Sequence, residues 1–357
     1  MSRLFTPHRF TPHGALAALA AACLCSGVLP ATAADPGPWT LGMHFENDLF
    51  HETDQNYTNG IRLSWTSPDT TSYQNDPAFP AWLRAANRQL RALHSNDSDL
   101  EHNLVVSLGQ LMFTPEDTDA SAPLPDQRPY AGYLYGGIAY HTRSSQRLDV
   151  MELELGILGP SARAHEAQDF IHDVRGFDKY NGWDNQLHDE PAVRLLYEQK
   201  RRLLETRWQG SFGQDFIAHA GTSLGNVATY LNFGGEYRVG WELPDDFGTS
   251  AVRAGGDNSA PGRREPRRRQ GGPIAYGLHG FVTLDARLVA RDIFLDGNTF
   301  KDSLGVDKKA AVADIAAGIS FLAGRWKVSY ARVVRTREFD GQSHPHRYGS
   351  VSLSYSL

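Results

Sequence analysis

Two short stretches of the chain carry the side chains that could do chemistry. The first holds Glu46, Asn47 and Asp48, and Thr58 follows about one strand length later. Carboxylate, amide and hydroxyl oxygens are the ligands that hard cations such as Ca²⁺ prefer. This stretch therefore predicts a cation site, with the alternative that Asn and Asp only end a strand in a turn.

The second stretch is a predicted helix between Gly-Pro-Ser at 159–161, which would cap its start, and Gly176, which would end it. His165, Gln168 and His172 are spaced three and four residues apart, so they would share one helix face. A neutral imidazole can take a proton from water, so His172 is the candidate general base. The alternative is an exposed and inert helix histidine.

The elements that must position these residues are strands. From Thr40 onward apolar and polar residues alternate in twelve segments of about ten residues, separated by Gly, Pro, Asn and Asp. The segments are 40–50, 57–67, 102–113, 130–142, 147–158, 191–200, 204–217, 228–240, 276–288, 311–322, 325–335 and 347–357. An even number of such strands predicts an all-β protein, a twelve-stranded antiparallel transmembrane β-barrel of the outer membrane with a short helix in an outer loop. A soluble β-sandwich is the alternative.

The alternation also predicts which way the site residues point. With Phe45 on the lipid face, Glu46, Asp48 and Thr58 point into the barrel. Asn47 falls on the lipid-facing parity, so its participation requires a bulge or a strand end.

With both termini in the periplasm, the first connection and the 159–190 connection lie at the outer rim. Asp48, Thr58 and His172 would then meet at a rim that faces the outer leaflet. Two long connections, 68–101 and 241–275, fall on the periplasmic side. The first contains a predicted amphipathic helix over 80–93, and the second contains an arginine cluster interpreted as a solvated loop. The cluster is Arg263, Arg264, Arg267, Arg268 and Arg269.

Composition excludes several classes of protein. The chain has 357 residues, 41% of them hydrophobic, and after residue 34 no run approaches the roughly 20 apolar residues of a membrane-spanning helix. A formal net charge of −6 gives no basic bias, so no nucleic-acid partner is expected. Residues 1–34 are predicted to be a secretory signal peptide that contains both cysteines, Cys23 and Cys25, which leaves 35–357 as one barrel domain.

Several motifs, in chain order, resemble the outer-membrane lipid A 3′-O-deacylase family. They are Phe45, Glu46, Asn47, Asp48 with Tyr57, Thr58, Asn59, Gly60; Gly109, Gln110 with Thr114, Pro115; Gln127, Arg128, Pro129, Tyr130, Ala131, Gly132; and Gly156, Ile157, Leu158, Gly159, Pro160 leading to Gln168, His172, Lys179, Tyr180 and Trp183. The resemblance implies a twelve-stranded barrel whose site lies between the wall and a helix in an outer loop. It also implies a calcium-dependent hydrolase that removes the 3′-linked acyloxyacyl group from lipid A of lipopolysaccharide.

Position by position, the resemblance implies catalytic roles for six residues: Asn47, Asp48, Thr58, Gln168, His172 and Asp178. His172 would be the general base on water, and Ca²⁺ would be held by Asn47, Asp48 and Asp178. Asp178 stands where the family's characterised type has Glu. The two long inner connections and the region near Thr118 and Asp119, which lacks a Lys match, also depart from the family pattern.

The implied partners are lipopolysaccharide and outer-membrane lipids, and the protein is expected to be a monomer. Two alternatives remain at this stage. An outer-membrane phospholipase usually relies on a Ser–His pair, and the scattered serines do not single one out. A pore or adhesin-like barrel would use the same residues only to solvate its loops.

Overall fold

The computed structural model describes residues 38–47, 56–70, 72–77, 79, 81–89, 100–208, 211–249, 261–262, 265, 267 and 274–357, with only the backbone for 56–58. The predicted signal peptide, Asp48 and four of the five clustered arginines lie outside these residues. The side chain of Thr58 lies outside them as well.

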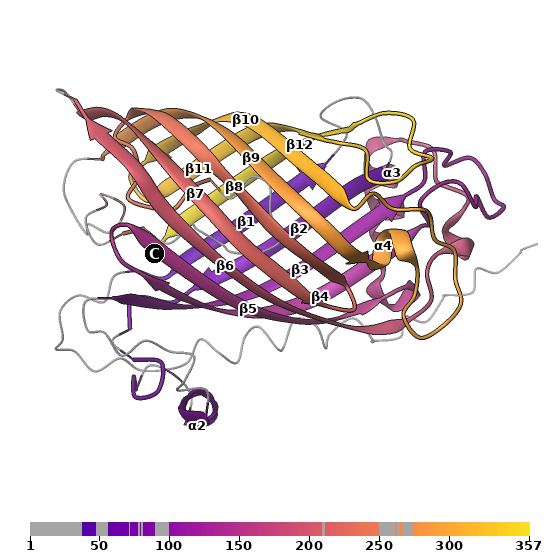
Figure 1. Ribbon diagram of the computed structural model, residues 1–357, viewed down its shortest axis with the longest axis horizontal. Coiled ribbons are helices and arrows are strands. Elements are labelled where there is room, and N and C mark those ends of the chain that lie inside the picture. The colour runs from indigo at the N-terminus through magenta and orange to yellow at the C-terminus, as the bar shows by residue number, and fades with distance from the viewer. Residues whose placement is uncertain are drawn as a thin grey trace, which may run out of the picture.

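The chain forms a closed barrel of twelve antiparallel strands in which β1 pairs with both β2 and β12 (Figure 1). The strands are β1 Thr40–Asn47, β2 Asn56–Thr66, β3 Glu101–Thr114, β4 Ala131–Arg143, β5 Arg147–Leu158, β6 Glu190–Arg207, β7 Phe212–Gly225, β8 Ala228–Trp241, β9 Tyr276–Asp292, β10 Ala311–Ala323, β11 Trp326–Arg335 and β12 His346–Ser356. The predicted fold class is confirmed. We call the end that holds the start of β1 and the end of β12 the terminal end, and the opposite end the α3 end.

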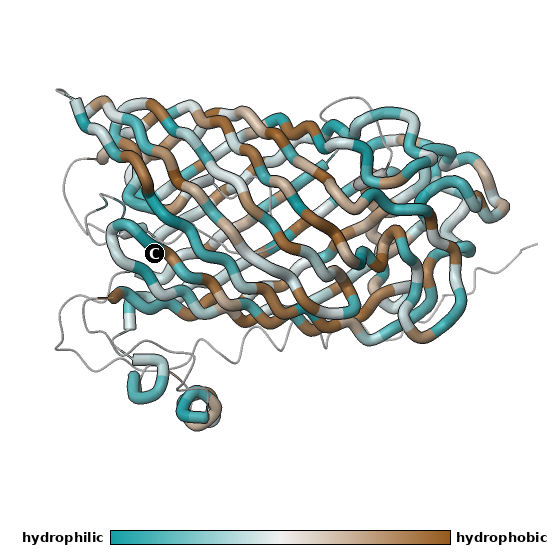
Figure 2. Tube along the Cα trace, viewed as in Figure 1, coloured by the Kyte–Doolittle hydropathy of each residue, from teal (hydrophilic) through white to brown (hydrophobic). Residues whose placement is uncertain are grey.

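Strict alternation of exposed and buried side chains builds this barrel. On β11, Trp326, Val328 and Val334 are exposed, whereas Lys327 and Ser329 between them are buried. The same alternation of apolar and polar residues follows the strands in Figure 2. A closed sheet with an apolar outer face leaves no unpaired backbone edge in lipid, which is the condition for crossing a membrane with strands.

Paired charges fill much of the interior. Arg62 donates to Glu152 at 2.7 Å, and Arg194 contacts Glu154 at 2.6 Å. A buried charge is tolerated only when it is paired and hydrogen-bonded, and these pairs satisfy that condition. Inward charged residues are therefore part of the strands and do not mark turns.

Burial of charged side chains inside the barrel explains why the boundary predicted between the sixth and seventh strands is wrong. The break predicted at 201–203 is wrong, because β6 continues to Arg207 and β7 begins only at Phe212. Arg202 points inward, where it donates to the carbonyl of Ser145 at 2.9 Å and to the carbonyl of Asp246 at 2.7 Å. Residues 200–202 are thus part of the strand, with Lys200 and Arg202 buried, and the predicted outer connection 218–227 shrinks to 226–227.

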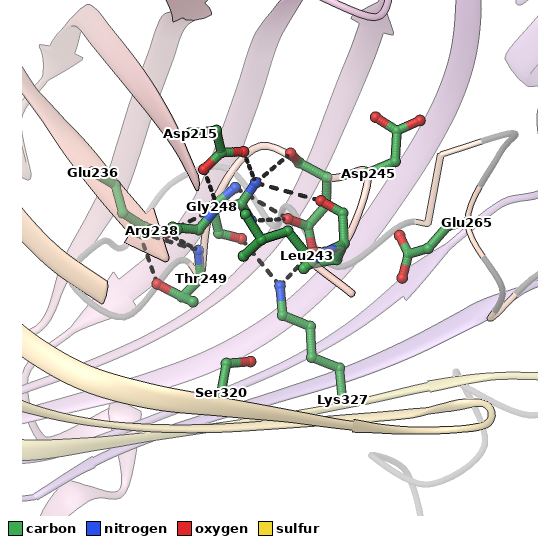
Figure 3. A network of polar contacts seen from close by, with 12 residues as sticks. Asp215, Glu236, Arg238, Leu243, Asp245, Gly248, Thr249, Glu265, Ser320 and Lys327 are labelled. Atoms are coloured by element: carbon green, nitrogen blue, oxygen red, sulfur yellow. Dashed lines mark hydrogen bonds and ion pairs between the residues drawn. The ribbon is translucent and has the colours of Figure 1, made fainter. Parts of the chain in front are cut away.

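The connection after β8 folds into the terminal end of the barrel. Figure 3 shows Arg238 between Asp215, 2.6 Å away, and the segment that follows β8, with Lys327 reaching the same network from β11. Lys327 contacts the buried carboxylate of Asp246. Arg267 is also buried, where it contacts Glu265, so the interpretation of the cluster as a solvated loop is wrong for this arginine.

The helix predicted over 80–93 is confirmed as α2, Ala81–Gln89. Among the described residues, no helix has the length and apolar content needed to span a membrane. At the α3 end, the short helix α4, Ile293–Asp296, turns Phe294 into the barrel, where it stacks on Phe113 with ring centroids 4.1 Å apart.

Candidate active site

The helix that carries the candidate base is α3, Ala164–Arg175. The predicted cap at Ser161 is wrong, because the hydroxyl and amide of Ser161 both bond to the carboxylate of Asp189, at 2.7 and 2.8 Å. Residues 160–162 form a 3₁₀ turn, and α3 begins after Arg163, whose φ of 59° breaks the helical path. The predicted end at Gly176 is confirmed: its φ is 71°, and its N–H bonds to the carbonyl of His172.

The start of α3 packs on the outer surface of the barrel wall. A Cβ placed on Gly132 would lie 2.6 Å from the Cβ of Ala164, so only glycine allows this approach. Gln110 of β3 also donates to the carbonyl of Ala162 at 2.7 Å. Gly132 has the same parity as the exposed Gly136, and Gln110 has the parity of Leu108, which is 50% exposed. Both contacts are therefore on the lipid-facing side of the wall.

A row of four paired residues leads from this helix contact to β1. Asn47 pairs with Asn59, Asn59 with Met112, and Met112 with Gly132. All four have lipid-facing parity, yet all four are buried, with Asn47 only 3% exposed. The candidate site is therefore between the outer wall and the loops of the α3 end, and not inside the barrel.

The inward direction predicted for Glu46 is confirmed, because Glu46 pairs with the buried Ser350 on the inner side of β12. The side chains of Asp48 and Thr58 lie outside the described residues, so their direction stays a prediction. The register between β2 and β3 shifts between Tyr57 and Asn59, so Thr58 is the extra residue of a β-bulge. A bulge re-aims the residues around it, which simple alternation could not predict. Asn47 has the lipid-facing parity, and this is the side of the wall on which α3 packs.

Gln168 and His172 are two of the three buried residues of α3, each 3% exposed. The side-chain oxygen of Gln168 accepts a hydrogen bond from the indole N–H of Trp183 at 2.6 Å. That bond fixes the amide orientation, and among the described residues the side-chain Nε2 of Gln168 has no hydrogen-bond partner. A buried donor left unsatisfied costs roughly 1–3 kcal/mol, so a group that accepts from it would bind favourably here.

The ring of His172 is held in one tautomer. Its Nδ1 lies 2.6 Å from the backbone carbonyl oxygen of Asp178, which can only accept a hydrogen bond. Nδ1 therefore carries the proton in the neutral ring, and Nε2 carries the lone pair. The rings of Tyr180 and Phe177 pack edge-on against the imidazole, with centroids 4.9 and 5.9 Å away.

Asp178 acts on His172 through its main chain, and its side chain is exposed. The substitution of Asp for the family's Glu therefore leaves this contact unchanged. A role of the Asp178 carboxylate in a cation site stays a prediction.

His165 does not join the buried line of α3. Its ring stacks on Trp183 with centroids 5.7 Å apart, and its Nε2 lies 3.6 Å from Asp169. Lys179 completes the charged outer surface of the helix, where hydrogen bonds from its ammonium to Asp173 and Asp169 raise its pKa.

Tyr130, Arg128 and Trp183, which belong to the family motifs, support the wall beneath α3. Tyr130 packs against Trp183 with ring centroids 5.0 Å apart, and Arg128 is buried over the ring of Phe113, 3.3 Å from Glu338. The proline-flanked motif 127–132 thus fixes the strand start on which α3 rests. Its spacing predicts a turn into a strand, but the partners come from distant parts of the chain.

An apolar stripe lies on the face of α3 that points away from the buried residues Gln168 and His172. Phe170 and Val174, one helical turn apart, are 68% and 71% exposed, and Phe177 follows them. An exposed apolar stripe on the outer side of a membrane barrel is suited to contact with lipid chains.

One serine pattern, Gly221 to Gly225 with Ser223 at its centre, has the spacing of a nucleophile elbow. Ser223 lies in the middle of this segment of β7, is fully buried, and donates to the carbonyl of Ala228 at 2.8 Å. A nucleophile elbow requires an exposed serine on a strand-to-helix turn, so this pattern does not support a serine hydrolase.

Two of the side chains that could bind a cation are amides on adjacent strands. Asn47 and Asn59 bring two amide side chains to adjacent positions of the row, and amide oxygens are ligands for hard cations. In the described part of the chain no group of three His, Cys, Asp or Glu side chains could hold a metal ion. Asp48, the predicted carboxylate ligand, lies outside the described residues.

The closed twelve-stranded barrel, with a loop helix packed on its outer wall, defines an integral membrane barrel whose candidate site faces the lipid. The sequence matches the family described as "Outer membrane protein LpxR" over residues 17–357, and the chain belongs to that family. It is accordingly an integral protein of the outer membrane. A search of curated proteins found no match.

Solved structures agree at the level of fold. LpxR from Salmonella typhimurium matches with a TM-score of 0.70 at 15% identity, covering 89% of this chain and 100% of that one. The β domain of the Bordetella autotransporter BrkA matches with a TM-score of 0.42 at 9% identity, covering 90% and 99%. At 15% identity, the likeness to the Salmonella structure shows a shared barrel fold.

Proposed function

We propose that this protein is a lipid A deacylase that hydrolyses the 3′-linked acyloxyacyl ester of lipopolysaccharide in the outer leaflet. The observation that carries the proposal is the buried pair on α3: a histidine held in one tautomer and, one turn before it, an amide donor without a partner. Family membership supports the outer-membrane setting. The site's position on the outer wall lets an ester reach it without leaving the bilayer.

In the proposed reaction, Nε2 of His172 takes a proton from water while the water oxygen attacks the ester carbonyl carbon. The oxyanion that forms accepts a hydrogen bond from Nε2 of Gln168, whose orientation Trp183 fixes. The bond between the carbonyl carbon and the 3′ oxygen then breaks, and the imidazolium returns its proton to that oxygen. The products are a free 3′ hydroxyl and the acyloxyacyl acid.

Calcium belongs to this proposal as a bound ion held by Asn47 and Asp48, with Asp178 as a further ligand. When bound, it would supply positive charge that polarises the ester carbonyl. Thr58, at the bulge beside Asn59, would help to place the water or the ion.

The lipid substrate is supported by Phe170 and Val174 on the exposed face of α3, opposite the buried pair, and by Phe177, whose ring lies 5.9 Å from that of His172. These side chains would contact the acyl chains while the sugar ester reaches the buried pair. Lys179 keeps a positive charge at neutral pH on the same helix region, where the phosphates of lipid A would approach.

The test is incubation of the purified protein with lipid A in calcium and, separately, in chelator, followed by mass spectrometry of the lipid. We expect loss of one 3′ acyloxyacyl unit in calcium only. Release of fatty acids from glycerophospholipids would support a phospholipase instead. No product from either lipid would support a barrel without catalytic activity.

A further inference from the structure

The helix α2 lies on the outside of the barrel near its terminal end (Figure 1). Its Leu83 belongs to a buried cluster with Tyr73, Phe79 and Leu104, against which Ile138 and Tyr140 also pack. Leu104, Ile138 and Tyr140 have the parity of lipid-facing side chains on β3 and β4. The helix therefore occupies a part of the wall that lipid would otherwise cover.

Specific hydrogen bonds hold the helix there. Asn87 is fully buried; its amide donates to the carbonyl of Tyr73 at 2.9 Å, and its oxygen accepts from the hydroxyl of Tyr140 at 2.6 Å. The hydroxyl of Tyr73 in turn donates to the carbonyl of Asn103 at 3.1 Å. Because both ends of the buried Asn87 amide are hydrogen-bonded, Asn87 fixes the rotation of α2 about its axis.

The height of the helix on the wall follows from strand register. Ile138 pairs with Leu153 on one side and with Val106 on the other, and Val106 pairs with Trp65. Leu153 is 43% exposed and Trp65 is 37% exposed, so both face lipid. The contact of α2 therefore lies at the height where the apolar band of the barrel ends at Trp65. Aromatic residues mark the border of the membrane on such barrels.

The fixed rotation gives α2 two different flanks. With Leu83 and Asn87 on the barrel, the spacing of 100° per residue places Trp82 and Ala86 on one flank and Arg84 and Arg88 on the other. Trp82 is 64% exposed. An apolar flank with a tryptophan opposite a basic flank is the pattern of a helix that lies in the membrane interface.

We propose that α2 binds the phospholipid monolayer at the terminal end of the barrel, with Trp82 at the acyl border and Arg88 at the headgroup phosphates. In the outer membrane this is the inner, periplasmic leaflet, because the termini of such barrels lie on the periplasmic side. The helix is a lipid-binding element separate from the deacylase site, which lies at the opposite end of the strands. This inference does not depend on the proposed reaction.

The experiment compares one labelled position on each flank. The chain has two cysteines, so a Cys23→Ser, Cys25→Ser background allows a single environment-sensitive fluorophore to be attached at Trp82→Cys or, as the matched control, at Arg88→Cys. Each protein is placed in vesicles of phosphatidylcholine and phosphatidylglycerol, with and without bromine on the acyl chains. We expect a blue-shifted emission at position 82 and quenching by bromine about threefold stronger than at position 88.

Equal, weak quenching at both positions, with emission as in water, would overturn the proposal. Equal, strong quenching would also overturn it, because it would place both flanks in the acyl chains. Heat-dependent mobility in gel electrophoresis reports that each labelled barrel is folded, so a loss of signal by unfolding is recognised independently. Deacylation of lipid A by both labelled proteins would confirm that lipid binding by α2 and the reaction are separate functions. If the unlabelled protein also fails to deacylate lipid A, only the proposed reaction is contradicted, and the proposal for α2 stands.

Discussion

The contact between Gly132 and α3 allows a test of how accurately the helix must be placed. In Gly132→Ala the new Cβ would lie 2.6 Å from the Cβ of Ala164, whereas carbon atoms in contact lie about 3.5–4.0 Å apart. The helix must therefore move away from the wall by roughly 1 Å, which carries Gln168 and His172 with it. A displacement of about 1 Å at a catalytic group can cost about 10²-fold in rate, so we expect a fall of that size in the deacylation rate.

The assay is the initial rate of deacylation of lipid A in detergent, with barrel folding followed by heat-dependent gel mobility. Gly136→Ala is the matched control, because it adds the same methyl group on the same exposed side of β4 with no atom closer than 3.8 Å. The double variant Gly132→Ala with Ala164→Gly removes the clashing carbon and should recover at least tenfold of the lost rate. A normal rate in Gly132→Ala, or an equal loss in Gly136→Ala, would refute the placement of the catalytic helix on the wall.

Three further predictions follow from the same geometry. Trp183→Phe keeps the ring but removes the bond to Gln168, so we expect kcat to fall about 10-fold with little change in KM, as measured by steady-state kinetics. An unchanged kcat would show that Gln168 needs no orientation. Asp178→Ala keeps the carbonyl that holds His172, so we expect a near-normal rate at saturating calcium and an affinity for calcium lowered about 10-fold, measured by titration of activity. A 10²-fold loss that calcium cannot restore would contradict this division of roles. Phe170→Ser with Val174→Ser should raise KM for long-chain lipid A while leaving the rate on a short-chain ester unchanged, and equal effects on both substrates would remove the stripe from acyl binding.

The fold could be predicted from the sequence because each strand repeats one local rule. Alternation such as that of Val328, Ser329 and Tyr330 depends only on neighbouring residues and on which side is apolar. The boundary between β6 and β7 could not be predicted, since Lys200 and Arg202 look solvated in sequence. Arg202 is buried with partners from the connection after β8, and Lys200 pairs with Glu198 on its own strand.

The site was less accessible to prediction for the same reason. The spacing of Gln168 and His172 places both on one helix face, but which side of the wall that face covers depends on Gly132 of β4. The bulge that contains Thr58 could not be predicted either, because one extra residue changes the parity and no local pattern marks it. Trp183 belongs to the family motifs, but its bond to Gln168 and its packing on Tyr130 depend on the folded chain and could not be predicted from spacing.

The central claim is that His172 is the base that activates water in a lipid A deacylase. The most direct measurement is the mass spectrum of lipid A from cells that make the protein or its His172→Gln variant, with both barrels present in equal amounts in the outer membrane. We predict that the normal protein yields lipid A without its 3′ acyloxyacyl unit and that the variant yields about 10²- to 10⁴-fold less of this product. The same product at the same level from both proteins would contradict the role of His172, and unmodified lipid A from the normal protein would contradict the proposed activity.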